Sequence, residues 1–362
     1  TVWGVNCLND LLAALNHPEL ETEKVYQPRI RAEDLLREGT GQDTGDFREV
    51  VGQENAKRGA EIAAAGFHNL LMIGPPGVGK SMVAGRIPGI LPPLTLKESL
   101  EVTGIFSVAG LLPPGQALIT RRPFYAPHHT VTQAALIGGG SGIPRPGMVS
   151  LAHRGVLFLD ELPEFRKNVL DGMRQPMEER KVQIARSAGM VTYPSDFILV
   201  AAMNPCPCGY YPDRNKCRCT QPQIEKYLGK ISGPILDRID LCVELHPVDI
   251  LHLQKTKTEK SSEDMKRQIR HARERQAERF AGTDCRFNGD IRSAQVEEYC
   301  PLGEEGQKVM EQLYRTLQLS ARVYHRILKT ARTIADLEDR EEITGEHLLE
   351  AACYRPSETY WN

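Results

Sequence analysis

An eight-residue segment, Gly74 to Ser81, constrains this chain more than any other feature. Its sequence, GPPGVGKS, fits the pattern GxxxxGK[ST] at every fixed position. An apolar run ends at Ile73 directly before it, and residues 80–87 can open a helix. Glycines here let backbone N–H groups turn toward phosphates, and a helix N-terminus adds positive potential. An accidental Gly/Pro turn is the alternative, but the strand and helix on either side favour a nucleotide-phosphate loop.

A second motif follows another apolar run, Val156 to Leu159, which leads into Asp160 and Glu161. Ligands gather at the carboxyl ends of strands in open α/β sheets. We therefore expect Asp160 to bind Mg²⁺, mainly through water, and Glu161 to orient and deprotonate the water that attacks ATP. Asp160 could instead cap a helix, because Pro163 stands just inside a plausible helix start.

Lys80 should reach the β- and γ-phosphates, and Ser81 should hold Mg²⁺. The expected nucleotide- and magnesium-binding residues are Gly74, Pro75, Pro76, Gly77, Val78, Gly79, Lys80, Ser81 and Asp160.

A third apolar run, residues 197–202, is followed by Asn204. An amide at a strand end can position the attacking water, whereas a turn-forming Asn is the alternative. Three buried strands that end in polar residues suited to one site favour the functional role. Apolar strands alternating with helices predict an α/β fold, a parallel sheet covered on both faces.

Composition narrows the class of protein. The 362 residues carry a net charge of −2, so any nucleic-acid partner must meet a local basic surface. No apolar run is long enough to cross a bilayer and no signal segment opens the sequence, so we expect a cytoplasmic protein without a membrane partner. We expect a lead-in over 1–46, an α/β core over 47–250, a charged linker over 251–287 with a solvated helix at 255–280, and a helical lid over 288–362.

The order of these motifs resembles that of AAA+ ATPases. More narrowly, residues 46–355 resemble the magnesium-chelatase-type clade. VGQENAKR at 51–58 is similar to the segment that lies against the base in that clade. Its helix-2 insertion is matched by three segments: RPFYAPHHT at 122–130, ALIGGG at 135–140 and PGMVSLAH at 146–153.

Within the clade, the sequence is most similar to the ComM (YifB) group, described as hexameric DNA helicases that drive branch migration in natural transformation. The resemblance implies an AAA+ core with insertions in helix 2 and before the first sensor, and a C-terminal α-helical lid. It implies ATP and Mg²⁺ as cofactors, a hexamer, and single-stranded or branched DNA as partner. Members of the group carry an upstream Lon-protease-like domain, which we expect to be missing here.

The resemblance also carries two arginines. Arg238, within GPILDRID, resembles the clade's arginine finger, which would stabilise charge on the γ-phosphoryl group of a neighbouring subunit. Arg238 could instead only pair with Asp237 and Asp240, as exposed ions commonly do. Arg322, within SAR, resembles the second sensor; an ordinary solvated helix arginine is its alternative. Whether Arg322 acts on its own nucleotide or a neighbour's stays open.

Residues 181–193 predict a β-hairpin with a turn at 187–189. In the resembling clade this is the pre-sensor hairpin, which points into the central pore, where Arg186 would contact a phosphate backbone. An edge hairpin with solvating charges is the alternative. The adjacent histidines of the insertion would be poor joint metal ligands on a strand, because successive side chains point to opposite faces, so we expect them to be structural or DNA-facing. The expected DNA-contacting residues are Arg186, Lys181, His128 and His129.

Four cysteines follow Asn204 in a short Pro/Gly-rich insert: Cys206, Cys208, Cys217 and Cys219. Four thiols in one loop can close a tetrahedral structural Zn²⁺ site, which leaves no position open for substrate. Four reduced thiols in an exposed loop are the alternative, although such thiols invite oxidation. We expect the metal to hold a surface loop rather than to perform chemistry.

The leading functional hypothesis is therefore an ATP-driven ring motor on DNA, a helicase for branch migration. A magnesium-chelatase-like subunit that remodels a protein partner is the second hypothesis. A nucleotide-gated binding switch with little turnover is the third. Glu161 and a trans-acting Arg238 argue against the third hypothesis.

Overall fold

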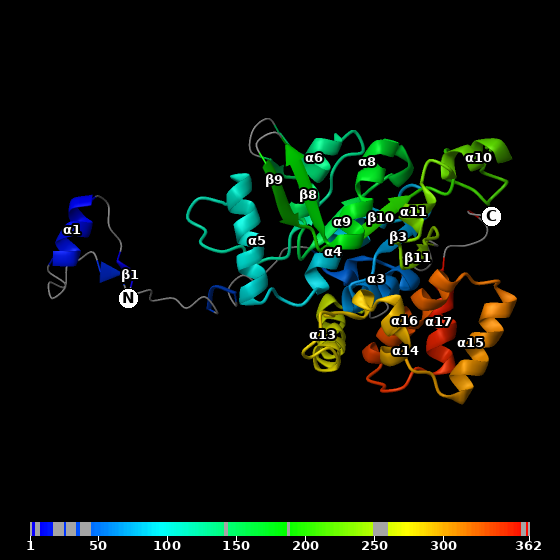
Figure 1. Cartoon of the computed structure of the whole chain (residues 1–362). Coiled ribbons are helices and arrows are strands. Elements are labelled where there is room, and N and C mark those ends of the chain that lie inside the picture. Colours follow the sequence, from blue (N-terminus) through cyan, green and yellow to red (C-terminus); the bar gives the residue numbers. More distant parts are fainter. Residues whose placement is uncertain are drawn as a thin grey trace.

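The computed structural model describes residues 2–3, 8–16, 25–26, 34–36, 45–140, 144–186, 189–248, 260–355 and 360. Its centre is a parallel sheet of five strands in the spatial order β11-β3-β10-β7-β4 (Figure 1). Numbered by their order along the chain, the five strands lie as 5-1-4-3-2. They are β3 (Leu70–Ile73), β4 (Phe124–Tyr125), β7 (Val156–Leu159), β10 (Ile198–Met203) and β11 (Leu241–Glu244).

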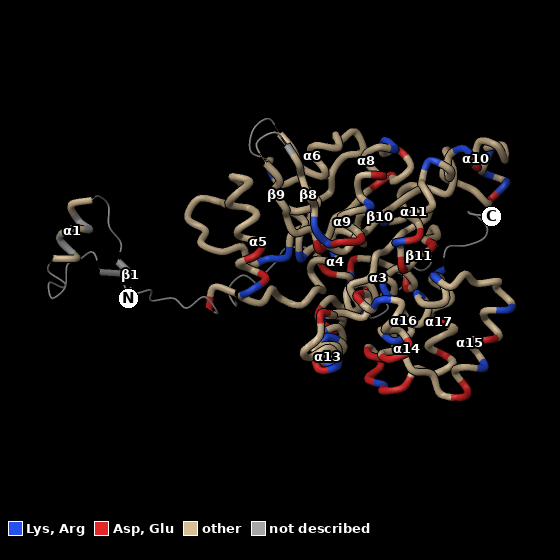
Figure 2. The backbone as a smooth tube through the Cα atoms, in the orientation of Figure 1, with Lys and Arg blue, Asp and Glu red and all other residues tan. Residues whose placement is uncertain are grey.

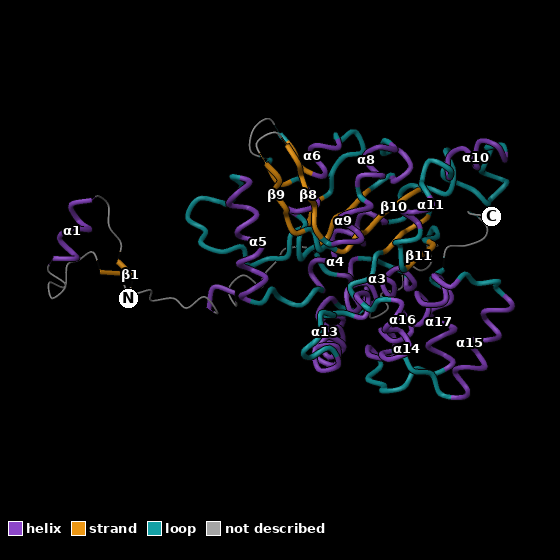
Figure 3. The backbone as a smooth tube through the Cα atoms, viewed as in Figure 1, coloured by secondary structure: helices purple, strands orange, loops and turns teal. Residues whose placement is uncertain are grey.

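Both faces of this sheet are buried. In Figure 3 its strands lie between helices. Alternate side chains of a strand point to opposite faces. Leu70 and Met72 accordingly belong to one apolar cluster, whereas Leu71 and Ile73 belong to a second. The predicted α/β sheet covered on both faces is thus confirmed.

The first apolar cluster continues from the sheet into the C-terminal helices, which confirms the predicted helical lid. Ile327 of α16 and Leu348 of α17 pack in the same cluster as Leu70 and Val243. The helices of this layer are α3 (Glu54–Gly66), α4 (Lys80–Ile90), α13 (Ser262–Arg279), α14 (Val296–Tyr299), α15 (Glu304–Thr316), α16 (Ala321–Leu337) and α17 (Gly345–Cys353).

Helix α13 differs from the solvated helix expected at 255–280. Most of its surface is charged, but Met265, Ile269, Ala272 and Gln276 are buried against the core. Their spacing of four, three and four residues places them on one face. The sequence analysis missed this face because three apolar side chains are outweighed by many charged neighbours. Residues 249–259 lie outside the described residues.

The second face of the sheet carries the predicted hairpin and most of the predicted helix-2 insertion. Phe124–Tyr125, which the sequence analysis placed in that insertion, instead forms strand β4 of the central sheet. The strands of the predicted hairpin pair antiparallel, with Lys181 opposite Pro194 and Arg186 opposite Gly189. Val182 and Ile184 are buried beneath the hairpin, which lies on the opposite side of the sheet from the lid (Figure 1). The elements here are α5 (Leu96–Ala109), α6 (Gln133–Ile137), β5 (Gly138–Gly139), β6 (Arg145–Pro146), α7 (Met148–Leu151), α8 (Lys167–Gly172), α9 (Arg174–Glu179), β8 (Lys181–Arg186), β9 (Gly189–Pro194), α10 (Gln221–Leu228) and α11 (Gly233–Leu236).

The remaining elements are short. The N-terminal part contains α1 (Leu8–Asn16) and two strands that pair antiparallel, β1 (Val2–Trp3) and β2 (Val25–Tyr26). Single 3₁₀ turns are η1 (Phe47–Glu49), η2 (Leu162–Glu164), η3 (Asn288–Asp290) and η4 (Ser293–Gln295). Among the described residues, no helix has both the length and the apolar character needed to span a bilayer.

Candidate nucleotide and metal sites

The register of the sheet brings three predicted site segments to one edge. Ile73 pairs with Met203, and Leu159 pairs with Ala201. The residues that follow these strands therefore emerge at the same carboxyl edge, where ligands of parallel sheets bind. They are Gly74 to Ser81, Asp160 with Glu161, and Asn204.

The loop from Gly74 to Ser81 has a conformation that requires its glycines. Gly77 and Gly79 have φ values of 80° and 95°, which residues with a Cβ rarely adopt. The loop is anchored where the Gly74 N–H donates to the carbonyl of Met203 at 3.2 Å. Helix α4 begins at Lys80, so its free N–H groups face the loop's interior. This arrangement can bind an anion such as a phosphate.

Lys80 is folded back into this loop. Its Nζ donates to the carbonyls of Gly74 and Pro75 at 2.6 and 2.9 Å, and to Oδ1 of Asn204 at 3.1 Å. Burial lowers the pKa of Lys80 below its usual value, and the nearby Asp160 and Glu161 oppose that shift. The ammonium group is therefore held by weak carbonyl partners, which a phosphate can replace.

The two carboxylates after β7 take different orientations. Ser81 Oγ donates to Asp160 Oδ2 at 2.9 Å, which places together the two groups predicted to hold Mg²⁺. The oxygen character of both groups suits that hard cation. Glu161 has a φ of 51°, and its side chain remains 56% exposed. The turn thus sends Asp160 toward the loop and leaves Glu161 available to a ligand.

His129 lies beside Glu161, with Nδ1 3.4 Å from Oε2. Its ring also lies tilted against the ring of His128, with centroids 4.0 Å apart. The sequence analysis assigned both histidines to DNA contact, and that role stays a prediction. The sequence analysis missed the contact with Glu161 because the two residues are 32 positions apart and are brought together by the pairing of β4, which precedes the histidines, with β7.

Arg238 lies at the opposite edge of the sheet. Asn69, directly before β3, donates from Nδ2 to the carbonyl of Arg238 at 2.8 Å. Its backbone N–H donates to Asp240 at 3.0 Å. Gly74 is the fifth residue after Asn69 along an extended chain, a span of about 16 Å. Arg238 is therefore remote from the phosphate loop of its own chain.

Arg322 shares this remote position. It pairs with Asp237, whereas Arg238 pairs with Glu178. Burial and the nearby cations Arg322 and Arg174 lower the pKa of Arg238. Arg238 and Arg322, the two arginines predicted to act on ATP, line one cavity of about 360 Å³. Among the described residues that line it, none belongs to the phosphate loop; the cationic ones are Arg238, Arg322, Arg326 and Lys329.

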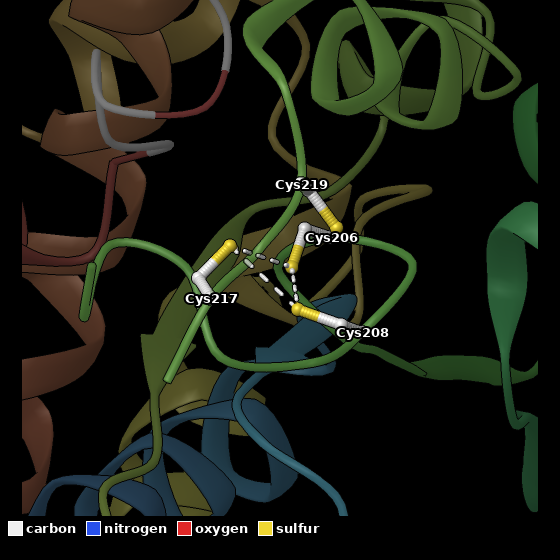
Figure 4. Close-up of side chains that lie close together, drawn as sticks. All are labelled: Cys206, Cys208, Cys217 and Cys219. Carbon is white, nitrogen blue, oxygen red and sulfur yellow. Dashed lines mark hydrogen bonds between the residues drawn. The ribbon is translucent and has the colours of Figure 1, made fainter. Parts of the chain in front are cut away.

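The four clustered cysteines point their sulfurs toward one another (Figure 4). All four Sγ atoms lie within 4.8 Å of one another, and the three pairs among Cys206, Cys208 and Cys217 are separated by 3.3 to 3.7 Å. A tetrahedral zinc with four bonds of 2.3 Å would place sulfurs about 3.8 Å apart. The donor set and its geometry therefore fit a four-thiolate metal site. Cys206 and Cys217 are buried, so the insert is more deeply packed than the expected surface loop.

Of the two basic hairpin residues predicted to contact DNA, only Lys181 has a side chain among the described residues. Lys181 is exposed at the start of β8, where Figure 2 shows basic residues. The Arg186 backbone pairs at the tip, but its side chain lies outside the described residues. Met190, also near the tip, is 69% exposed.

Several supporting residues escaped the sequence analysis. Gln53 donates to the carbonyls of His246 and Val78 at 2.6 and 3.4 Å, which ties the segment before α3 to the phosphate loop. The side-chain hydroxyl of Tyr227 in α10 interacts with the backbone N–H of Asn204, and burial raises the pKa of this tyrosine. Isolated polar residues of this kind carry no sequence pattern; their partners are distant along the chain.

The strand order, the phosphate loop and the lid together define an AAA+ protein. The chain belongs to the magnesium chelatase, subunit ChlI, family, whose model matches residues 46–253. The C-terminal model of the same family matches residues 259–355.

Relatives agree with this placement. The chain is 46% identical over 314 residues to the protein named uncharacterized protein YifB of Salmonella typhimurium, covering 86% of this chain and 60% of that protein. It is 43% identical over 357 residues to competence protein ComM of Haemophilus influenzae, covering 96% and 66%. The magnesium-chelatase 67 kDa subunit of Chlorobaculum parvum is 24% identical over 283 residues, covering 73% and 38%. The chain thus spans about 60% of the first relative's length.

Proposed function

We propose that this chain is the motor part of an ATP-hydrolysing ring that acts on DNA, as a helicase for branch migration. One observation carries the ring: the phosphate loop and Arg238 lie at opposite edges of the same sheet. A complete site then requires a second chain, whose Arg238 faces the first chain's nucleotide.

The proposed chemistry assigns each residue at the carboxyl edge a separate task. Lys80 exchanges its carbonyl partners for the β- and γ-phosphates, and Ser81 with Asp160 holds Mg²⁺, which neutralises charge on the phosphates. Glu161 accepts the proton of the attacking water, and Asn204 orients that water. Asn204 already meets Lys80, so a water near the γ-phosphate would lie within its reach.

Arg238 and Arg322 are proposed to act together on the neighbour's nucleotide. Both line one cavity and each is held by an acidic partner, Glu178 or Asp237. A γ-phosphate can compete for these arginines, because charge-assisted contacts with guanidinium groups are strong. Hydrolysis would then depend on assembly, which we propose to be a hexamer.

Two observations support DNA as the client. The match to the relative named competence protein ComM covers nearly the whole chain. The ComM group, which the sequence resembles, is described as acting on branched DNA. The hairpin exposes Lys181 on a scaffold packed directly on the sheet. Phosphate contacts from such a hairpin would track a strand without base specificity.

A second candidate is a magnesium-chelatase-like subunit that remodels a protein. The match to the ChlI family model favours it. In that case the hairpin would grip a polypeptide rather than a phosphate backbone. The four-cysteine site is proposed to hold a structural Zn²⁺ in either case.

ATPase rate measured with and without branched DNA tests the proposal. We expect stimulation by DNA and binding that weakens as salt rises. Glu161→Gln should bind ATP but hydrolyse it about 100-fold more slowly, since it cannot accept the proton. Neither stimulation nor salt-sensitive binding, with ATPase intact, would favour the protein-remodelling candidate.

A further inference from the structure

We infer that the four-cysteine insert is a positioning element of the nucleotide site: its closed fold holds Asn204 and Pro76 in the arrangement that receives ATP. The inference rests on the proposed ATP and metal sites and extends them. It concerns the insert from Cys206 to Cys219, which was expected only to stiffen a surface loop. Three contacts with the phosphate-binding region carry it.

The first contact is along the chain. Asn204 follows β10, and its Oδ1 accepts a hydrogen bond from Lys80 at 3.1 Å. Cys206 follows after a single residue and is fully buried. A metal on the Cys206 thiolate would therefore fix the backbone directly beside Asn204. A shift of the Asn204 backbone away from Lys80 would therefore displace a metal ligand.

The second contact is through Gly209, at the end of the turn that Cys206 opens. The Gly209 N–H donates to the carbonyl of Cys206 at 3.0 Å. Gly209 lies against the phosphate loop so closely that a Cβ there would stand 2.6 Å from Cδ of Pro76. The same Cβ would stand 3.8 Å from Cγ of Asn204. The cysteine turn is thus one wall of the phosphate loop, and Pro76, a ring without side-chain rotors, transmits any displacement.

The third contact comes from the far end of the insert. Cys219 leads through Thr220 into α10, and the side-chain hydroxyl of Tyr227 in that helix interacts with the backbone N–H of Asn204. Tyr227 is 7% exposed and packs in the same apolar cluster as Cys206 and Cys217. Both ends of the insert therefore meet at Asn204. A four-thiolate metal that joins these ends would hold the backbone at Asn204 from two sides.

A matched pair of glycine variants tests this contact. Gly209→Ala adds a methyl group against Pro76, whereas Gly282→Ala adds one at a similar φ, +78° against +85°, with nothing within 4 Å. Both variants place a Cβ at a similar positive φ, so the difference in their affinities reports the contact with Pro76. We expect Gly209→Ala to bind a fluorescent ATP analogue about tenfold more weakly than Gly282→Ala, since displacements near 1 Å at such sites have large effects.

Metal removal supplies the second arm. Protein with its zinc measured at about one ion per chain would be stripped with a chelator, and analogue affinity measured without turnover in Mg²⁺-containing buffer. We expect weakened affinity that returns when Zn²⁺ is restored. Unchanged affinity in the stripped protein, together with equal affinities of the two glycine variants, overturns the inference. Failure of the unaltered protein to bind the analogue overturns the ATP site itself, and the inference with it, so the two failures are distinguishable.

Discussion

The two edges of the central sheet are built on different physical principles. At the carboxyl edge, Lys80 donates hydrogen bonds to carbonyl oxygens of its own phosphate loop. At the amino edge, charged side chains are already paired. Asp196 contacts Arg154, Arg180 and Arg286, and burial, which alone would raise its pKa, is outweighed by these cations.

This difference indicates that the carboxyl edge is open to a ligand, whereas the paired charges around Asp196 at the amino edge form a fixed scaffold. A buried carboxylate with several cationic partners is costly to disturb. The amino edge also joins separate parts of the molecule: Arg180, directly before the hairpin, pairs with Asp290 beside the lid. Glu178 of α9 pairs with Arg238 and lies three residues before the hairpin starts. A neighbour's nucleotide drawing Arg238 from Glu178 would therefore act at the base of the hairpin.

Lys80→Ala gives the largest expected effect and tests the carboxyl edge. The variant removes the cation that would meet the phosphates, a loss of about 100-fold or more in ATP affinity. Equilibrium binding of a fluorescent ATP analogue measures it, with Lys308→Ala on exposed α15 as the control. Normal binding and hydrolysis by Lys80→Ala would overturn the site assignment.

Arg238→Ala tests whether the amino edge acts on another chain. We expect ATP binding to be retained and turnover to fall about 1,000-fold, as for other arginine fingers. Mixing Arg238→Ala with Lys80→Ala subunits should restore some activity, because intact composite sites form between them. The control is Arg315→Ala, whose side chain is 77% exposed. Absence of recovery at any mixing ratio contradicts the trans geometry.

Lys181→Ala extends the comparison from the amino edge to the hairpin. We expect basal hydrolysis to persist, DNA affinity to fall about fivefold, and the salt dependence to lose about one phosphate contact. Titrations of labelled DNA at several salt concentrations measure both quantities. Lys308→Ala again serves as the control, and equal behaviour of the two variants would remove Lys181 from the DNA surface.

His129→Ala gives the smallest expected change and sharpens the carboxyl edge. Its contact with Glu161 competes with the water that this carboxylate must deprotonate. Loss of the imidazole should raise basal hydrolysis by about threefold, the scale of an exposed ion pair. Steady-state turnover without DNA measures it, against His271→Ala on α13, where the side chain is 67% exposed. A change only in DNA affinity would instead support the DNA-facing role predicted for His129.

Local patterns determined much of this protein without its tertiary structure. The segment from Gly74 to Ser81 is predictable because phosphate binding needs backbone groups and glycines in one continuous stretch. The three apolar strands ending before Gly74, Asp160 and Asn204 predicted the parallel sheet and its functional edge. The four-cysteine metal site was recognisable because its four ligands lie close together along the chain. By contrast, α13 was misjudged, since its few buried side chains are outnumbered by charged ones.

Only the tertiary structure decided how these parts meet. The sequence places Arg238 after Asn204, but strand pairing puts it at the amino edge beside Asn69. The contact of His129 with Glu161 depends on two strands being neighbours. The packing of Gly209 on Pro76 arises from loops 133 positions apart. Such contacts follow from the side-by-side order of strands and the packing of layers, which local residue patterns do not encode, because periodicity reports which face is buried and not what covers it.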